Sequence, residues 1–208
     1  MGNVILVGGF CEIIELCEEN SIKIVGIIDN ISEKNYYGYP IICNDEAASH
    51  AFLQYKNTPI IITPDSPSIR EKLFLKYSEI GFNFFSLIAK DSKISKSAII
   101  GTGCVIQNGT NLSSNSVIGD FVKLNTNANV MHDVNIGNFT TIAPNSVILG
   151  KVKIGEKSYI GANSTILPYT NVGNSSIVGA GAVVTKDVYS NIVVVGNPAK
   201  KLKEHGSR

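Results

Sequence analysis

The sequence contains no tryptophan and only three histidines among its 208 residues. Its four cysteines, Cys11, Cys17, Cys43 and Cys104, have neither metal-ligand nor disulfide-framework spacing. This pattern favours reduced thiols, and with them a cytoplasmic protein. No apolar run reaches the roughly 18 residues of a membrane span. A net charge of +1 and the lack of a basic run argue against a nucleic-acid partner.

Strands alternating with helices are predicted for residues 1–88. Aliphatic or aromatic runs predict four strands, at residues 3–10, 22–28, 59–63 and 82–88. Helical patterns occupy residues 11–20, 44–53 and 66–81, and the last has Ser66 as its cap, Pro67 at its first position and Gly81 at its end. This alternation predicts a small, Rossmann-like parallel sheet with binding groups at the carboxyl ends of its strands.

A strict six-residue period replaces this pattern after Asp91. Every sixth residue from Ile94 onward is Ile, Leu or Val. The series comprises Ile94, Ile100, Ile106, Leu112, Ile118, Leu124, Val130, Ile136, Ile142, Ile148, Ile154, Ile160, Ile166, Val172, Val178 and Val184. Such a hexapeptide repeat predicts a parallel β-helix. The series covers about five triangular coils of 18 residues each and ends where Ser190 interrupts it.

Glycines recur at the 18-residue spacing of one coil. They stand at Gly101, Gly119, Gly137, Gly155 and Gly173, and again at Gly161 and Gly179. Glycine at a corner predicts either a positive φ angle or a close approach of two backbones. The narrow prism leaves little internal room, so we expect ligands to bind outside it, between packed copies of the chain.

Two stretches carry a resemblance to a known family. The repeat, followed by the segment VVVGNPAK at residues 193–200, resembles the left-handed β-helix acyltransferases of the hexapeptide superfamily. The α/β region joined to LNTNANVMHDVNIGNFTTIAPNSVILGKVKIG, residues 124–155, is similar to one branch of it. That branch contains the sialic acid O-acetyltransferases and the N-acetyltransferases of nucleotide-linked 4-amino-sugars, such as the UDP-bacillosamine pathway enzyme.

The resemblance implies an N-terminal nucleotide-sugar-binding domain over residues 1–88 and a left-handed β-helix over residues 91–190. A short C-terminal tail or helix is expected over residues 191–208. The family is homotrimeric, takes acetyl-CoA as acyl donor in a groove between neighbouring β-helices, and contributes to surface glycan assembly. The implied reaction is N-acetylation of a nucleotide-linked amino-dideoxy sugar.

Individual site residues also follow from the resemblance. The catalytic histidine and the acidic residue after it match His132 and Asp133. Imidazole titrates near neutral pH, which suits a general base that takes the acceptor's proton. The expected cofactor-binding positions are Thr141, Ala162, Ala180 and Lys186. The expected substrate-binding positions are Gly8, Gly9, Glu12, Asp29, Asn30 and Asn125. No metal site is expected, because three scattered histidines do not form a cluster.

Two departures leave the acceptor and the acyl group open. The glycine-rich turn of the family carries a histidine, whereas this chain has GGFCEII at residues 8–14, in which Glu12 would repel a diphosphate. A second family histidine is replaced by Thr141. O-acetylation of a sialic acid-type sugar and a non-catalytic trimeric scaffold therefore remain as alternatives.

Overall fold

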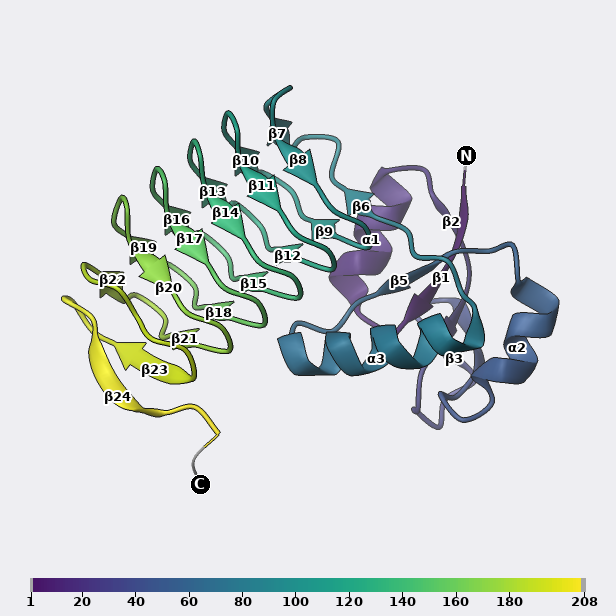
Figure 1. Ribbon diagram of the computed structural model, residues 1–208. Coiled ribbons are helices and arrows are strands. Elements are labelled where there is room, and N and C mark those ends of the chain that lie inside the picture. The colour runs from purple at the N-terminus through teal and green to yellow at the C-terminus, as the bar shows by residue number, and fades with distance from the viewer. Residues whose placement is uncertain (1, 207–208) are drawn as a thin grey trace.

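The computed structural model describes residues 2–206, whereas Met1 and the last two residues of the predicted tail, 207–208, lie outside the described part (Figure 1). An α/β unit comes first, and a long stack of triangular coils follows it. The α/β unit packs beside the N-terminal end of the stack, and α3 runs across the junction (Figure 1).

The sheet of the α/β unit has the order β3-β4-β2-β1-β5. Strands β1, β2, β4 and β5 are parallel, and β3 pairs antiparallel with β4. The elements are β1 (Asn3–Val7), α1 (Cys11–Glu19), β2 (Lys23–Ile28), β3 (Asn35–Tyr36), β4 (Tyr39–Cys43), α2 (Ala48–Tyr55), β5 (Ile60–Ile62) and α3 (Pro67–Ile80). Helix α3 begins at Pro67 and is followed by Gly81 with φ +106°, as predicted; Ser66 stands at the cap position, but its side chain makes no capping hydrogen bond.

The predicted fourth strand at residues 82–88 is only partly formed. Phe84 makes an isolated parallel bridge to Ile60 of β5, at the edge of this sheet, and β6 (Leu87–Ile88) pairs with the repeat region. The sheet also contains β4, which follows Gly38 and is not among the predicted strands. Gly38 turns the chain with φ +82°, and the Ile41–Ile42 run then extends β4. Pro40 is tolerated because it stands near the start of the strand.

The repeat region forms three parallel sheets, one for each side of a triangular prism, with strands 18 residues apart in register. Hexapeptide repeats and parallel strands of this kind fit a left-handed β-helix. The strands are β7 (Lys93–Ile94), β8 (Ile99–Ile100), β9 (Val105–Ile106), β10 (Asn111–Leu112), β11 (Val117–Ile118), β12 (Lys123–Leu124), β13 (Asn129–Val130), β14 (Asn135–Ile136), β15 (Thr141–Ile142), β16 (Val147–Ile148), β17 (Lys153–Ile154), β18 (Tyr159–Ile160), β19 (Thr165–Ile166), β20 (Asn171–Val172), β21 (Ile177–Val178) and β22 (Val183–Val184).

The aliphatic residue of nearly every hexad points into the prism. From Ile106 to Val184 these side chains form one continuous buried cluster. Small residues such as Ser146, Ser158 and Ser176 are fully buried where the chain turns between sheets. The hydroxyls of these serines donate to glycine or tyrosine carbonyls of the next coil, so the buried hydroxyl groups have hydrogen-bond partners within the prism.

The repeated glycines serve close backbone approach rather than a positive φ. A Cβ on Gly137 would lie 2.6 Å from the backbone nitrogen of Glu156 on the next coil, which leaves no room for a side chain. The positive φ angles fall elsewhere in the turns and are mostly adopted by other residue types, among them Asn115, Asp133 and Phe139. Asparagine and aspartate tolerate this conformation better than most residues.

The C-terminal segment forms strands, so the expectation of a tail or helix is wrong there. Strand β23 (Ile192–Val195) continues the prism by pairing with β21, at a spacing shortened to 16 residues. Strand β24 (Lys200–Glu204) then returns antiparallel to β23. The apolar run of residues 192–195 favours a strand, and the Gly196–Pro198 turn directs the chain back along it.

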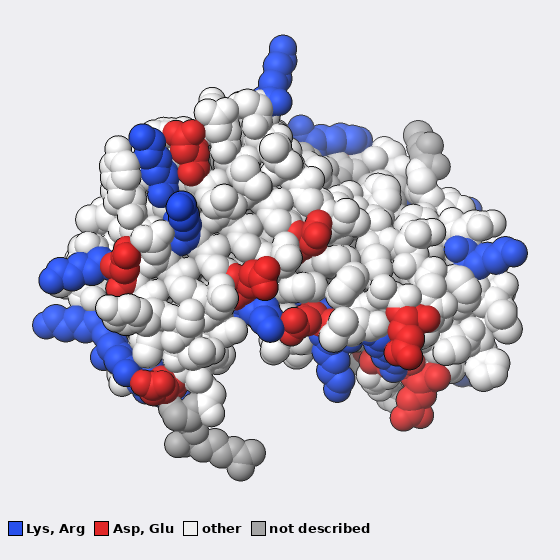
Figure 2. All heavy atoms as spheres, viewed as in Figure 1, with Lys and Arg blue, Asp and Glu red and all other residues white. Residues whose placement is uncertain are grey.

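Charged side chains of both signs are interspersed on the face shown in Figure 2. Within residues 2–206, no helix combines the length and the apolar character that crossing a membrane requires.

Candidate functional site

His132 and Asp133 lie in the turn between β13 and β14, at one corner of the prism. The Nδ1 atom of His132 is 2.8 Å from Oδ2 of Asp133. Asp133 adopts φ +59°, a conformation that lets its carboxylate fold back toward the preceding ring. Both side chains are accessible, with 54% of His132 and 39% of Asp133 exposed, so a substrate can reach them.

Hydrogen bonding determines which nitrogen of His132 is basic. The bonds from His132 and from the Asn115 amide, 3.2 Å away, hold the pKa of Asp133 below its usual value. An ionised carboxylate can only accept hydrogen bonds. Nδ1 of neutral His132 must therefore carry the hydrogen, and Nε2 is left with a free lone pair. His132 is therefore arranged as a general base, and the Asp133 carboxylate orients its ring.

Gly150 lies against the ring of His132, one coil further along the stack. A Cβ atom built on Gly150 would lie 2.7 Å from both Cε1 and Nε2 of His132. The φ of Gly150 is not positive, so alanine is compatible with its backbone. The glycine therefore leaves the space that the basic nitrogen occupies.

We expect Gly150→Ala to lower kcat about 10²-fold by displacing the imidazole, since a misplacement of about 1 Å can have that effect. The fold should persist, because the turn tolerates a methyl group once the exposed ring moves. Steady-state kinetics beside a thermal melt check this expectation. A variant with full activity would show that the position of the ring is unimportant.

A cavity of about 370 Å³ opens at the carboxyl ends of the parallel strands. It brings together four predicted positions, Gly8, Gly9, Asp29 and Asn30. Its remaining lining residues are Val7, Phe10, Ile28, Asp45, Thr63, Pro64, Ile69 and Leu73. We call it the strand-end cavity. Glu12, on the exposed first turn of α1, is not among the lining residues, so the structure does not bring it to the other four.

The turn after β1 is already held by a carboxylate. Oδ2 of Asp29 accepts the backbone N–H of Gly9 at 2.6 Å. A phosphate at this N–H would have to displace Asp29 and would meet its negative charge. The cavity is therefore better suited to hydrogen-bond donors, such as ribose hydroxyls or the N–H groups of a base.

Asp45, Thr63 and Pro64 are among the lining residues that the sequence did not predict. Asp45 donates its N–H to Oδ1 of Asn30 and accepts from Nδ2 of Asn30, which fixes the Asn30 amide. Thr63 donates its hydroxyl to the carbonyl oxygens of Val7 and Gly8, and Pro64 follows it. Thr63 and Pro64 end a predicted strand, so the rule that ligands gather at strand ends indicates them. Asp45 comes from a loop, for which no sequence signal exists.

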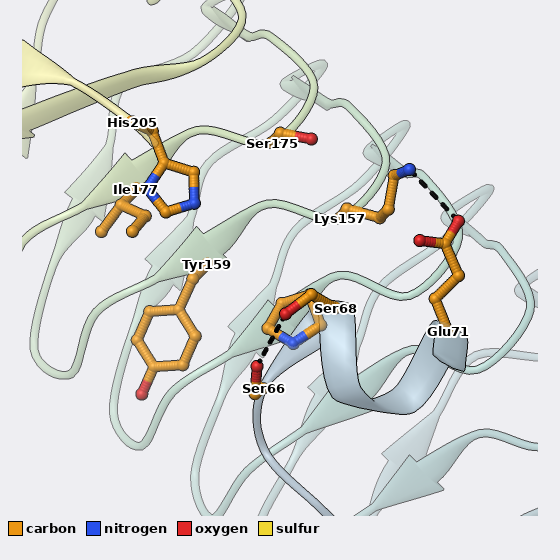
Figure 3. A pocket seen from close by; sticks show the side chains of 9 residues that line it. Ser66, Ser68, Glu71, Lys157, Tyr159, Ser175, Ile177 and His205 are labelled. Carbon is orange, nitrogen blue, oxygen red and sulfur yellow. Dashed lines mark hydrogen bonds and ion pairs between the residues drawn. The ribbon is translucent and has the colours of Figure 1, made fainter. Parts of the chain in front are cut away.

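A second cavity, of about 460 Å³, lies between the N-terminus of α3 and the outer face of the stack (Figure 3). Ser66 and Ser68 line it from the helix, and Tyr159 and Ile177 line it from β18 and β21. Its other lining residues are Pro67, Glu71, Lys157, Ser175 and His205. Lys157 and Glu71 form an ion pair at 3.1 Å on its rim (Figure 3). We call it the helix-side cavity.

Thr141 lies directly beside this cavity in the sheet. It is paired in register with Tyr159, and it is buried. Its hydroxyl donates to the carbonyl oxygen of Asp65 at 2.7 Å. That hydroxyl therefore joins the stack to the α/β unit in this structure.

Three of the remaining predicted positions lie on another corner of the prism, whereas Lys186 lies on the corner of His132. Asn125, Ala162 and Ala180 occupy equivalent turns, after β12, β18 and β21, whereas His132 follows β13. Asn125 is buried, and Ala180 and Lys186 are exposed. Within one protomer the catalytic pair is therefore on a different corner from Asn125, Ala162 and Ala180, and only Lys186, after β22, shares its corner. Over residues 2–206, no group of three or more His, Cys, Asp or Glu side chains forms a metal site.

A family of known proteins matches the repeat region. Bacterial transferase hexapeptide (six repeats) covers residues 115–150 and 151–186. No curated protein matches the chain.

Solved structures resemble almost the whole chain. The acetyltransferase domain of PglB from Neisseria gonorrhoeae FA1090, in complex with acetyl-CoA, is 30% identical with a TM-score of 0.90, over 96% of this chain and 98% of that one. A mutant of the GDP-perosamine N-acetyltransferase from Caulobacter crescentus, in complex with CoA and GDP-perosamine, is 27% identical with a TM-score of 0.92, over 98% of both chains. WeeI from Acinetobacter baumannii AYE is 29% identical with a TM-score of 0.84, over 96% of this chain and 100% of that one.

Proposed function

This chain belongs to the hexapeptide-repeat acyltransferases, in the branch of the nucleotide-sugar N-acetyltransferases, and we propose that it transfers an acetyl group from acetyl-CoA to the amino group of a nucleotide-linked amino-dideoxy sugar. The observation that carries this proposal is the His132–Asp133 pair, with Nδ1 engaged and Nε2 available. A base so arranged serves acyl transfer to an amine. The products of such a reaction serve surface glycan assembly.

His132 removes a proton from the acceptor amine as that amine attacks the thioester carbonyl. The proton goes to Nε2, and Asp133 stabilises the imidazolium that results. Backbone N–H groups hold the developing oxyanion. The same imidazolium then returns the proton to the departing thiolate. Such general-base assistance contributes about 10²–10⁴ in rate.

We assign residues 1–88 to a Rossmann-like nucleotide-sugar-binding domain, residues 91–190 to a left-handed β-helix of about five coils, and residues 191–208 to a C-terminal segment. Asp29 and Asn30 in the strand-end cavity bind the nucleoside, with Gly8 and Gly9 beside them. Glu12 and Asn125 complete the proposed substrate contacts. Ala162, Ala180 and Lys186 contact acetyl-CoA, whereas Thr141 is buried with its hydroxyl donated to Asp65 and supports the helix-side cavity from behind.

The active enzyme is a homotrimer with its sites between subunits. The support for this is the separation of His132 from both cavities, neither of which it lines. In such a trimer, His132 of a neighbouring subunit would lie beside the cavities of this chain and would complete the active site. Solved structures of similar fold contain CoA or acetyl-CoA, which supports a CoA thioester as the donor.

Asp29→Asn is expected to raise the KM for the nucleotide sugar about tenfold, since a hydrogen bond to a charged group contributes about 1.5–3 kcal/mol. The amide oxygen can still accept from Gly9, so the turn should keep its shape. The KM for acetyl-CoA should not change. If the nucleotide-sugar KM is also unchanged, Asp29 does not contact the substrate.

Thiol release from acetyl-CoA identifies the acceptor. The panel comprises UDP-, GDP- and dTDP-linked 4-amino-sugars, with sialic acid as the hydroxyl acceptor. Turnover on an amino-sugar supports the proposal and identifies the nucleotide. Turnover on sialic acid alone would replace it with O-acetylation, and silence across the panel would favour a non-catalytic scaffold.

A further inference from the structure

The segment Thr63–Ser66 connects β5 to α3 and separates the two cavities. Thr63 and Pro64 line the strand-end cavity, and Ser66 lines the helix-side cavity. The position of this segment therefore determines how the two cavities lie relative to each other. Under the proposed function, one cavity receives the nucleotide and the other borders the site of acyl transfer.

Lys123 reaches this segment from β12 of the stack. Its side chain is only 1% exposed, and its Nζ is 2.7 Å from Oδ1 of Asp65 and 2.9 Å from the carbonyl oxygen of Thr63. The ring of Phe10, at the turn after β1, lies 4.8 Å from the same ammonium. The Lys123 ammonium thus contacts both the turn after β1, at Phe10, and the loop after β5, at Thr63 and Asp65.

Arg70, on the first turns of α3, holds the same segment from the other side. It is 1% exposed, and its NH1 atom donates to the carbonyl oxygens of Pro64 and Asp65 at 3.0 and 2.8 Å. Its remaining donors reach the stack, at the carbonyl oxygens of Phe121, Phe139 and Thr140. The carbonyls of three consecutive residues, 63 to 65, are therefore all bound by buried cations.

We propose that Lys123 and Arg70 are positioning residues, which clamp the Thr63–Ser66 segment onto the β-helix and so align the bound nucleotide sugar with the site of acyl transfer. The inference rests on the proposed function for its kinetic consequence, but the clamp itself is a matter of geometry. The burial of these cations is weak evidence for a role in stability, because apolar groups of similar volume often replace buried ionic groups without loss. Instead, these two cations fix the position of the Thr63–Ser66 segment relative to the β-helix.

Lys123→Met keeps an unbranched side chain that is one atom shorter, and it removes both polar contacts. We expect kcat/KM for the nucleotide amino-sugar to fall about 10–100-fold, as misalignment of bound reactants does. The KM for acetyl-CoA should stay near that of the wild type. Amide hydrogen exchange over residues 63–69 should become faster. Asp65→Asn, at a side chain 44% exposed, should fold normally and show a smaller change in the same direction.

Lys90→Met is the matched control. Lys90 also donates to a backbone carbonyl of the α/β unit, that of Glu19 at 2.8 Å, but it is exposed and lines neither cavity. Its replacement should leave both kinetics and exchange at residues 63–69 unchanged. Thermal melts of all variants show whether the fold persists.

Two results would overturn the clamp. One is unchanged exchange at residues 63–69 in Lys123→Met and Asp65→Asn. The other is a loss of activity that affects both substrates equally and follows the melting temperature, because that is ordinary destabilisation. If the wild type acetylates no acceptor, the proposed function fails, but the exchange experiment still decides whether the clamp exists.

Discussion

His132→Ala is expected to lower kcat about 10²–10⁴-fold, the range that general-base assistance provides. The loss should lie toward the lower end for an amine acceptor, since an amine needs less activation than an alcohol. KM values should change little, because the exposed ring contributes more to proton transfer than to binding. Steady-state kinetics of thiol release, with both substrates varied, measure the effect.

Two variants sharpen this result. Asp133→Asn should have an intermediate effect, because it keeps the shape of the side chain but removes the charge that stabilises the imidazolium. His50→Ala should have none, since His50 lies on the exposed side of α2. Full activity in His132→Ala would remove the catalytic assignment, whichever acceptor is used.

Ile154→Ala is expected to reduce the free energy of unfolding by about 2–5 kcal/mol, as large-to-small changes in a packed core do. Ile154 is 3% exposed and belongs to the continuous aliphatic cluster of the prism. Its neighbours on adjacent coils, Ile136 and Val172, have only narrow space in which to move. Denaturant unfolding at one fixed protein concentration measures the change.

Lys153→Ala provides the comparison within the same strand. Lys153 points outward from β17 and is exposed, so its replacement should change stability by less than about 0.5 kcal/mol. Equal effects at positions 153 and 154 would contradict the alternation of inward and outward residues on which the description of the prism rests.

The β-helix could be predicted in detail because its period repeats. Each inward position from Ile94 to Val184 follows from one rule, and the structure places all of them on two-residue strands. The glycines were harder to interpret, since sequence leaves a positive φ and a close backbone approach both open. In the folded protein Gly137 lies against Glu156, and the positive φ belongs to Phe139.

The α/β unit was predicted less well because its elements are short and do not repeat. Residues 82–88 have the composition of a strand, but their partner depends on where the two units meet, which is a tertiary property. Likewise Pro40 suggests a turn, and only the neighbouring β2 shows that the residues after it extend the sheet.

In the candidate site, too, contacts between neighbouring residues could be predicted, whereas contacts that depend on the tertiary fold could not. The His132–Asp133 contact follows from adjacent residues, and Asp29 from its place at a strand end. Asp45 and the cations at Lys123 and Arg70 are brought to their partners by long-range folding, over separations that leave no local signal.

The most direct test of the account compares two acceptors with one enzyme preparation. One is a nucleotide-linked 4-amino-sugar and the other is its 4-hydroxy counterpart, both with acetyl-CoA. We predict turnover of the amine with formation of an amide, seen by NMR, and a far lower kcat/KM for the hydroxyl compound. Equal or preferential acetylation of the hydroxyl, or no amide product, would contradict the account.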